Sequence, residues 1–130
     1  MKSIKKLENF YNKYLILLGA NKRLSCLDVG CGWGFLAAHF QEKYLGIEVD
    51  VSKLKFATKR YGGEKFRFHD FSVKAPVNQF GYFDQCFALT VIDEIQNKKS
   101  ALKFIHTHLK KGGTLYVEVR NKEFCVRVLL

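Results

Sequence analysis

Hydrophobic positions along the chain alternate between helical and extended spacing. Apolar residues at helical spacing from Ile4 to Leu18 predict an amphipathic helix, and the apolar run Leu24–Val29 predicts a buried strand. The pattern then repeats, with helices expected at 34–41, 52–61 and 97–111 and strands at 44–49, 66–69, 82–89 and 114–120. Strands that alternate with helices predict an α/β domain with a mostly parallel sheet and right-handed crossovers.

Several boundaries have local signals. Ser52 is the expected N-cap of the second crossover helix, which Gly62 and Gly63 should end, and Gly112 with Gly113 should stop the helix at 97–111. The stretch 71–81 holds the only proline and little periodicity, so it is expected to be a loop. Residues 124–130 are apolar and predict either a helix or a strand returning beside the fifth.

A glycine-rich turn follows the first strand, at the edge where open α/β sheets bind ligands. Gly30, Gly32 and Gly34 alternate, whereas a dinucleotide fingerprint reads G-x-G-x-x-G and would have its third glycine at Phe35. Asp28 would repel a pyrophosphate but attract an ammonium group, such as that of the methionine half of S-adenosylmethionine. The turn therefore favours a cationic ligand.

The stretch L-D-V-G-C-G-W-G, Leu27 to Gly34, resembles the first motif of the class I S-adenosylmethionine-dependent methyltransferases, hydrophobic-D-hydrophobic-G-x-G-x-G. The resemblance implies a Rossmann-like three-layer sandwich, with about five or six strands in the order 3-2-1-4-5. It also implies that S-adenosylmethionine is the cofactor and that the loop binds it through Asp28, Gly30, Cys31, Gly32 and Gly34.

Further acids follow the next two strands. Glu48 ends the second strand, where nucleotide-binding sheets carry an acid that accepts both ribose hydroxyls, and Asp50 is a nearby competitor. The resemblance adds Val49 beside Glu48. It also implies that Asp70 accepts the adenine amino group and that Phe71 forms an apolar wall.

Two later segments extend the resemblance, which covers about residues 24–120. F-D-Q-C-F-A-L-T-V-I-D, from Phe83, is similar to the family's fourth motif and brings Ala88, Leu89 and Thr90 near the ligand. L-K-K-G-G-T-L, from Leu109, is similar to L-K-P-G-G-x-L before the fifth strand, with lysine replacing proline.

Methyl transfer from a sulfonium is an in-line displacement, so alignment and exclusion of water can supply much of the acceleration. A base is optional; Asp93, Glu94 and His106 are candidates, and no catalytic residue is assigned. The chain lacks D-P-P-Y, N-P-P-Y and Pro-Cys, which disfavours amino methylation of adenine or glutamine and cytosine C5 chemistry. Small molecules, RNA and protein termini stay open as acceptors, with small molecules slightly favoured.

Composition narrows the class of protein. The 130 residues predict a single domain, 1–130, with an N-terminal helix in 1–20 and a core in 24–120. Neither a membrane-spanning stretch nor a signal peptide is found, so a cytoplasmic protein is expected. The four cysteines form no C-x-x-C pair, which favours reduced thiols and no metal site.

The formal net charge of +10 favours an anionic partner such as RNA, although lysines spread along the chain fit a solvated surface equally well. The chain also ends before the helix and antiparallel hairpin that usually complete the family's sheet and acceptor pocket. Two rival interpretations follow: a cofactor-binding remnant or regulatory subunit, and a basic nucleic-acid-binding module. The resulting sheet edge could be covered by homodimerisation.

Overall fold

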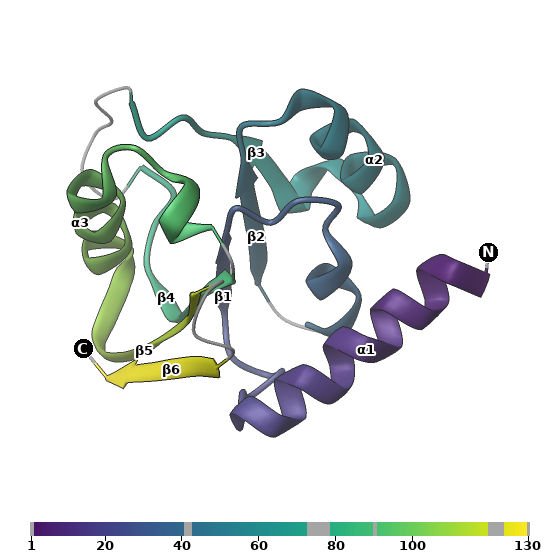
Figure 1. Cartoon of the computed structure of the whole chain (residues 1–130), viewed down its shortest axis with the longest axis horizontal. Helices are drawn as coiled ribbons and strands as arrows, with labels where there is room; N and C mark the ends of the chain where they lie inside the picture. Colours follow the sequence, from purple (N-terminus) through teal and green to yellow (C-terminus); the bar gives the residue numbers. More distant parts are fainter. Residues whose placement is uncertain (1, 41–42, 73–78, 90, 120–123, 130) are drawn as a thin grey trace.

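A computed structural model describes residues 2–40, 43–72, 79–89, 91–119 and 124–129. Its sheet has the order β3-β2-β1-β4-β5-β6, with β1–β5 parallel and β6 antiparallel to β5 (Figure 1). The strand bounds are β1 Cys26–Val29, β2 Tyr44–Glu48, β3 Phe66–Phe68, β4 Phe83–Leu89, β5 Leu109–Val119 and β6 Phe124–Leu129. The α/β sandwich with strand order 3-2-1-4-5 is thus confirmed.

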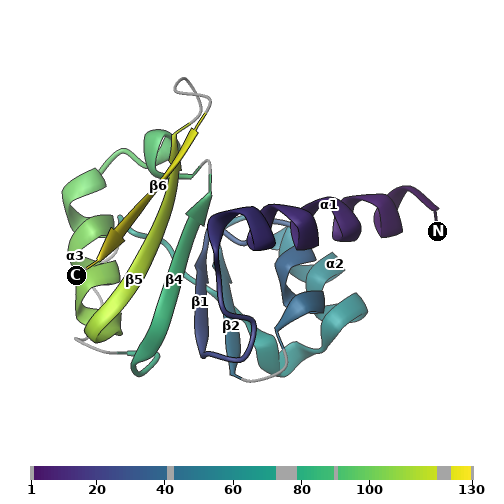
Figure 2. The same ribbon diagram turned by 90° about the horizontal axis from the view of Figure 1, so that it is seen from below.

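Helices cover both faces of the sheet, as Figure 2 shows. Phe104 and Ile105 of α3 pack on one face, whereas Leu15 of α1, Leu36 of η1 and Ala57 of α2 pack on the other. The helical bounds are α1 Lys2–Leu18, η1 Phe35–His39, α2 Val51–Tyr61, η2 Gly63–Lys65, η3 Ile92–Glu94 and α3 Lys98–His108.

Alternation along β1 divides its side chains between the two layers. Leu27 and Val29 belong to the core under α3, whereas Cys26 and Asp28 point to the face that carries α1 and η1. Asp28 is therefore the one polar side chain in a fully buried strand, and it lies next to the turn that follows the strand.

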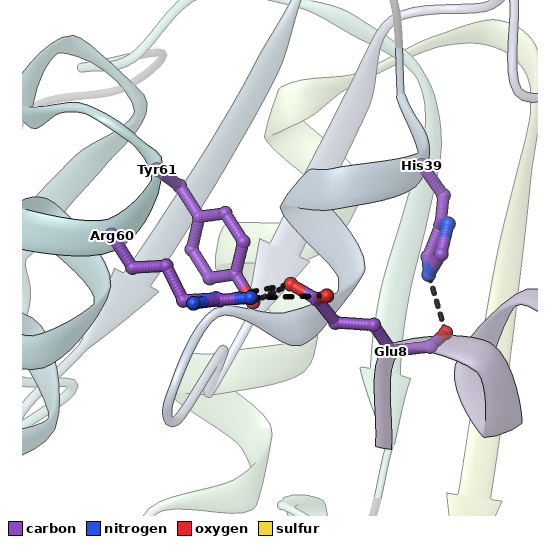
Figure 3. A network of polar contacts seen from close by, with 4 residues as sticks. All are labelled: Glu8, His39, Arg60 and Tyr61. Atoms are coloured by element: carbon purple, nitrogen blue, oxygen red, sulfur yellow. Dashed lines mark hydrogen bonds and ion pairs between the residues drawn. The ribbon is translucent and has the colours of Figure 1, made fainter. Parts of the chain in front are cut away.

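A polar network fixes α1 on this face (Figure 3). The buried carboxylate of Glu8 accepts hydrogen bonds from Arg60 Nε and Nη2, at 3.1 and 3.2 Å, and from the hydroxyl of Tyr61. His39 Nε2 lies 2.6 Å from the backbone oxygen of Glu8. One turn of α1 thereby contacts both η1 and the end of α2.

Two predicted helix starts differ from the observed ones. Asp50, not Ser52, caps α2, because its side chain accepts from the backbone N–H groups of Ser52 and Lys53. The helix expected at 34–41 is a short 3₁₀ helix, η1, which begins after Gly34 in a left-handed conformation (φ 83°) and ends at His39. Asp50 is the N-cap because it directly precedes Val51, the first residue of α2, and has an extended backbone, whereas Ser52 already lies within the helix.

The predicted end of the last helix was wrong. α3 stops at His108, and β5 begins at Leu109 and includes Gly112 and Gly113, which were expected to end the helix. Leu109 is buried and pairs with Phe83, and the ladder shifts register between Phe83 and Gln85. Core burial of Leu109 within the sheet thus overrides the helical periodicity that runs through 97–111.

Two further segments complete the comparison with the predicted elements. Residues 124–129 form a strand paired with β5 from Thr114 to Val119, which decides between helix and strand. Part of the loop expected at 71–81 lies outside the described residues, and Thr90 lies outside them too.

Candidate cofactor site

Two adjoining cavities, of about 520 and 420 Å³, open at the carboxyl ends of β1, β2 and β4. They share part of their lining and so form one continuous depression, called the groove below. The shared residues are Gly30, Glu48, Val49, Val91, Glu94 and Ile95. The larger cavity extends toward β3, and the smaller one extends over the glycine loop toward α1.

Two loop glycines bring bare backbone to the groove. The N–H groups of Gly30 and Cys31 both donate to the carbonyl oxygen of Ile47, at 2.9 and 3.0 Å, which ties the loop to β2. Gly30 has φ 68°, and a Cβ there would lie 2.3 Å from Val91. Gly32 has φ 57°, and a Cβ there would meet nothing within 4 Å. The backbone at Gly32 is therefore open to a ligand.

Gly34, which the resemblance implies is a cofactor contact, lies outside the two cavities. A Cβ added to it would lie 2.9 Å from both Ala57 and Phe66. Its small size lets the start of η1 pack against α2 and β3. The third glycine of the motif thus serves packing in this structure.

Asp28 lies at the floor of the smaller cavity with 3% of its surface exposed. Burial is the main cause that raises its pKa to about 7; a hydrogen bond from the Tyr44 hydroxyl, at 2.6 Å, limits this rise, and the charge of Glu48 adds to it. A cation placed beside Asp28 would restore the carboxylate form. The position therefore suits an ammonium group.

Glu48, and not Asp50, lies on the groove. Its Oε1 accepts from the N–H of Gly32 at 2.9 Å, and its Oε2 accepts from the N–H groups of Val49 and Asp50, both at 2.9 Å. Asp50 is engaged in capping α2. Of the two acids that the sequence left open, Glu48 has the geometry to face a ligand's hydroxyl groups.

The larger cavity ends at Asp70 and Phe71. The Asp70 carboxylate accepts from the N–H of Ser72 at 2.9 Å, and this bond lowers its pKa, so the side chain is ionised at neutral pH. His69, which sequence reasoning did not single out, also lines this end; its ring packs edge-on against Phe71 at 4.7 Å and stacks on Phe104 at 4.6 Å. Burial lowers the pKa of His69 and keeps it neutral.

Aromatic residues line the other end of the groove. Tyr11 of α1 joins Trp33 and Phe35 there, and Lys53 of α2 lies beside them. Tyr11 is partly buried against the core and also lines the groove. A helix that the sequence places before the first strand gives no local signal that it folds back over the loop.

Of the other residues that were expected near the ligand, some line the groove and others do not. Leu89 lines the smaller cavity, whereas Ala88 is fully buried in the core and lines neither cavity. Of the candidate bases, Glu94 lines both cavities, His106 is exposed on α3 and lines neither, and the side chain of Asp93 is outside the described part. Among the described residues, Cys26, Cys31 and Cys86 are free thiols, and no group of three potential metal ligands occurs.

Comparison with known proteins agrees with this geometry. A family model described as a methyltransferase domain matches residues 27–115, from the glycine loop to β5. The chain belongs to the methyltransferase domain family. Two curated relatives are pavine N-methyltransferase from Thalictrum flavum subsp. glaucum, 30% identical over 101 residues, and phosphoethanolamine N-methyltransferase 1 from Zea mays, 32% identical over 99 residues.

These matches cover 72% and 70% of this methyltransferase domain but only 28% and 19% of the two relatives. Among solved structures, the [4+2]-cyclase SpnF is 26% identical with a TM-score of 0.61, covering 86% of this chain and 43% of that one. An S-adenosylmethionine-dependent methyltransferase from Thermotoga maritima, 21% identical, shares the fold with a TM-score of 0.63, covering 90% and 60%.

S-Adenosylmethionine is the cofactor of this family, as the sequence motif implied, and several structural neighbours contain its demethylated product, S-adenosylhomocysteine. The groove fits such a molecule. The smaller cavity holds the buried acid Asp28, and Glu48 is an acid for a diol where the two cavities meet. Phe71 forms an aromatic wall in the larger cavity, and the backbone at Gly32 is open. No helix among the described residues is long and apolar enough to cross a membrane.

Proposed function

We propose that this methyltransferase domain binds S-adenosylmethionine in the groove and transfers its methyl group to a small-molecule amine. The observation that carries the proposal is the open backbone at Gly32 between the buried Asp28 and the groove-facing Glu48. That arrangement matches a ligand with an ammonium group and a ribose diol.

The proposed contacts follow the charges along the groove. Asp28 would hold the ammonium group of the methionine half, and Glu48 would accept from the ribose hydroxyls. Asp70 and Phe71 would hold the adenine, the first through its amino group and the second by apolar contact. When bound, the cofactor supplies an electrophilic methyl group on its sulfonium.

The residues of the chain would then position and shield the reaction. Tyr11 and Phe35 line the smaller cavity and would exclude water from the methionine half of the cofactor. Glu94 lines both cavities at the end of η3. There its carboxylate would attract a cationic amine and accept the proton that the amine must lose to expose its lone pair.

An amine acceptor is supported by two observations. Both curated relatives are named N-methyltransferases, of pavine and of phosphoethanolamine. In addition, four acidic residues are found among the described residues that line the groove, in a chain of net charge +10: Asp28, Glu48, Asp70 and Glu94. A groove of this sign attracts cations and repels the phosphates of RNA.

The test combines calorimetry with an activity assay. We expect the wild-type chain to bind S-adenosylmethionine and to release S-adenosylhomocysteine with small amines, and Glu94→Gln to keep cofactor affinity while losing turnover. Glu64→Gln, at an exposed acid away from the groove, is the matched control and should change neither.

Other outcomes select the rival interpretations. Cofactor binding without transfer to amines, other small molecules or peptides would favour a cofactor-binding remnant. Salt-dependent RNA binding without cofactor affinity would favour a nucleic-acid-binding module. Either result would overturn the proposed activity.

A further inference from the structure

Lys53 is an exception in the groove. Among the described residues it is the one lysine or arginine that lines either cavity, although the chain has 22 such residues. It lies in the first turn of α2, on the side of the helix that faces the glycine loop. The presence of one lysine among the acids of the groove suggests that it binds an anionic group of the ligand.

The Lys53 ammonium lies over an aromatic ring and forms no ion pair with a described acid, although its charge acts on the nearby Asp50 carboxylate. Its Nζ lies 5.7 Å from the ring centroid of Trp33, over the ring, in cation–π contact. Trp33 is itself held edge-on by Phe56, with centroids 5.4 Å apart. The two ion pairs found among the described residues, Arg60–Glu8 and Lys110–Asp84, do not include Lys53.

The charges of the smaller cavity show what this cation could bind. Asp28, Glu48 and Glu94 all line it, and a methionine end brings both an ammonium and a carboxylate group. With the ammonium beside Asp28, the ligand's carboxylate is repelled by three acids unless a cation offsets them. Lys53 lines the same cavity and is the available cation.

From this juxtaposition we propose that Lys53 binds the carboxylate of the methionine half and so completes a two-point recognition of the amino acid, with Asp28 holding its ammonium. The inference rests on the proposed cofactor binding. The Trp33 ring would hold the lysine side chain in place before the ligand arrives, because the cation–π contact limits its conformations.

The test compares two ligands that differ only in the carboxylate. S-Adenosylmethionine and its decarboxylated analogue are titrated into wild-type protein, Lys53→Met and Lys55→Met, with folding checked by thermal unfolding. Lys55 is exposed on the same helix and lines neither cavity, so its variant is the matched control. The analogue keeps the ammonium, sulfonium and adenosine groups.

We expect Lys53→Met to weaken S-adenosylmethionine binding about tenfold, the typical effect of one lost charged contact, and to leave the analogue within about twofold. Lys53→Arg should retain the preference for the carboxylate, and Lys55→Met should change neither affinity.

Three results would overturn the inference. Equal losses for both ligands would mean that Lys53 supports the shape of the loop. Unchanged binding of both ligands by Lys53→Met would mean that another group holds the carboxylate. If the wild-type protein bound neither ligand, the proposed cofactor binding itself would fail, which the wild-type titration reveals before any variant is compared.

Discussion

Asp28 is a buried acid whose pKa of about 7 should make cofactor binding depend on pH. The ionised form attracts the ligand's ammonium, and its fraction rises about tenfold from pH 6 to pH 8 for such a pKa. We therefore expect affinity for S-adenosylmethionine to rise about tenfold over this interval, with protons released on binding. Calorimetry in buffers of different ionisation enthalpy measures both quantities.

Asp28→Asn is the control for this effect, because the amide keeps the shape and cannot titrate. Its affinity should be low and nearly independent of pH; a dependence equal to that of wild type would place the titration elsewhere. The raised pKa also affects stability: the contribution of the neutral acid is full below pH 3.8 and is lost as the pH rises through about 7.

Alanine substitutions at Gly32 and Gly34 should have different effects, because Gly32 faces the open groove and Gly34 packs against Ala57 and Phe66. Gly32→Ala should cost roughly 1 kcal/mol through its positive φ and should abolish cofactor binding, because the methyl group enters the open space. Gly34→Ala should cost more, roughly 2–3 kcal/mol, because of contacts with Ala57 and Phe66. Chemical unfolding and calorimetry separate the two effects; equal stability losses would contradict the assignment.

At the scale of elements, α1 depends on Glu8 for its position. Arg60 lowers the pKa of Glu8 by hydrogen bonding, so this stabilising contribution is present above pH 4.5 and is lost as the pH falls through the lowered value. Glu8→Gln should lower the free energy of unfolding by roughly 1–2 kcal/mol, the scale of a lost charged hydrogen bond.

The same variant should weaken cofactor binding, because α1 carries Tyr11 into the groove. Lys6→Gln, on the exposed side of α1, is the control and should leave both quantities unchanged. A Glu8→Gln protein with full stability and affinity would show that α1 docks through its apolar residues alone.

The start of α2 gives a further prediction. Asp50→Ala removes the cap that accepts from the N–H groups of Ser52 and Lys53, so it should lower the melting temperature. Ser52→Ala, which the sequence had suggested as the cap change, should have the smaller effect. The opposite order in thermal unfolding would restore Ser52 as the cap.

The periodicity of apolar residues predicted which segments are helices and which are strands, but it did not predict all of their boundaries. Apolar spacing runs on from Ala101 through Leu109, but Leu109 pairs with Phe83 in the sheet, and only the tertiary structure shows that partner. The positions of Asp28 and Glu48 at the groove could be predicted because the fold brings the carboxyl ends of β1 and β2 to one edge of the sheet. Tyr11 and Lys53 could not, because their distance from the loop depends on how two helices pack.

For the whole molecule, net charge alone was a poor guide to the site. The total of +10 suggested an anionic partner, whereas the groove contains four acids and one lysine among its described lining residues. The net charge of the whole chain and the charge of the site can differ in sign, because the electrostatic potential inside a cleft depends mainly on the nearest charged groups. Homodimerisation through the sheet edge stays a prediction, and sedimentation analysis over a range of protein concentrations tests it.

The bond from the Gly32 N–H to Glu48 has a kinetic consequence. It fastens the loop to β2 before any ligand is present. We therefore expect the loop to keep its shape between turnovers, so that spent cofactor leaves and fresh cofactor enters without a slow opening step. The residence time of S-adenosylhomocysteine would then reflect its own contacts, and the Gly32 amide would exchange slowly with solvent even in the ligand-free protein.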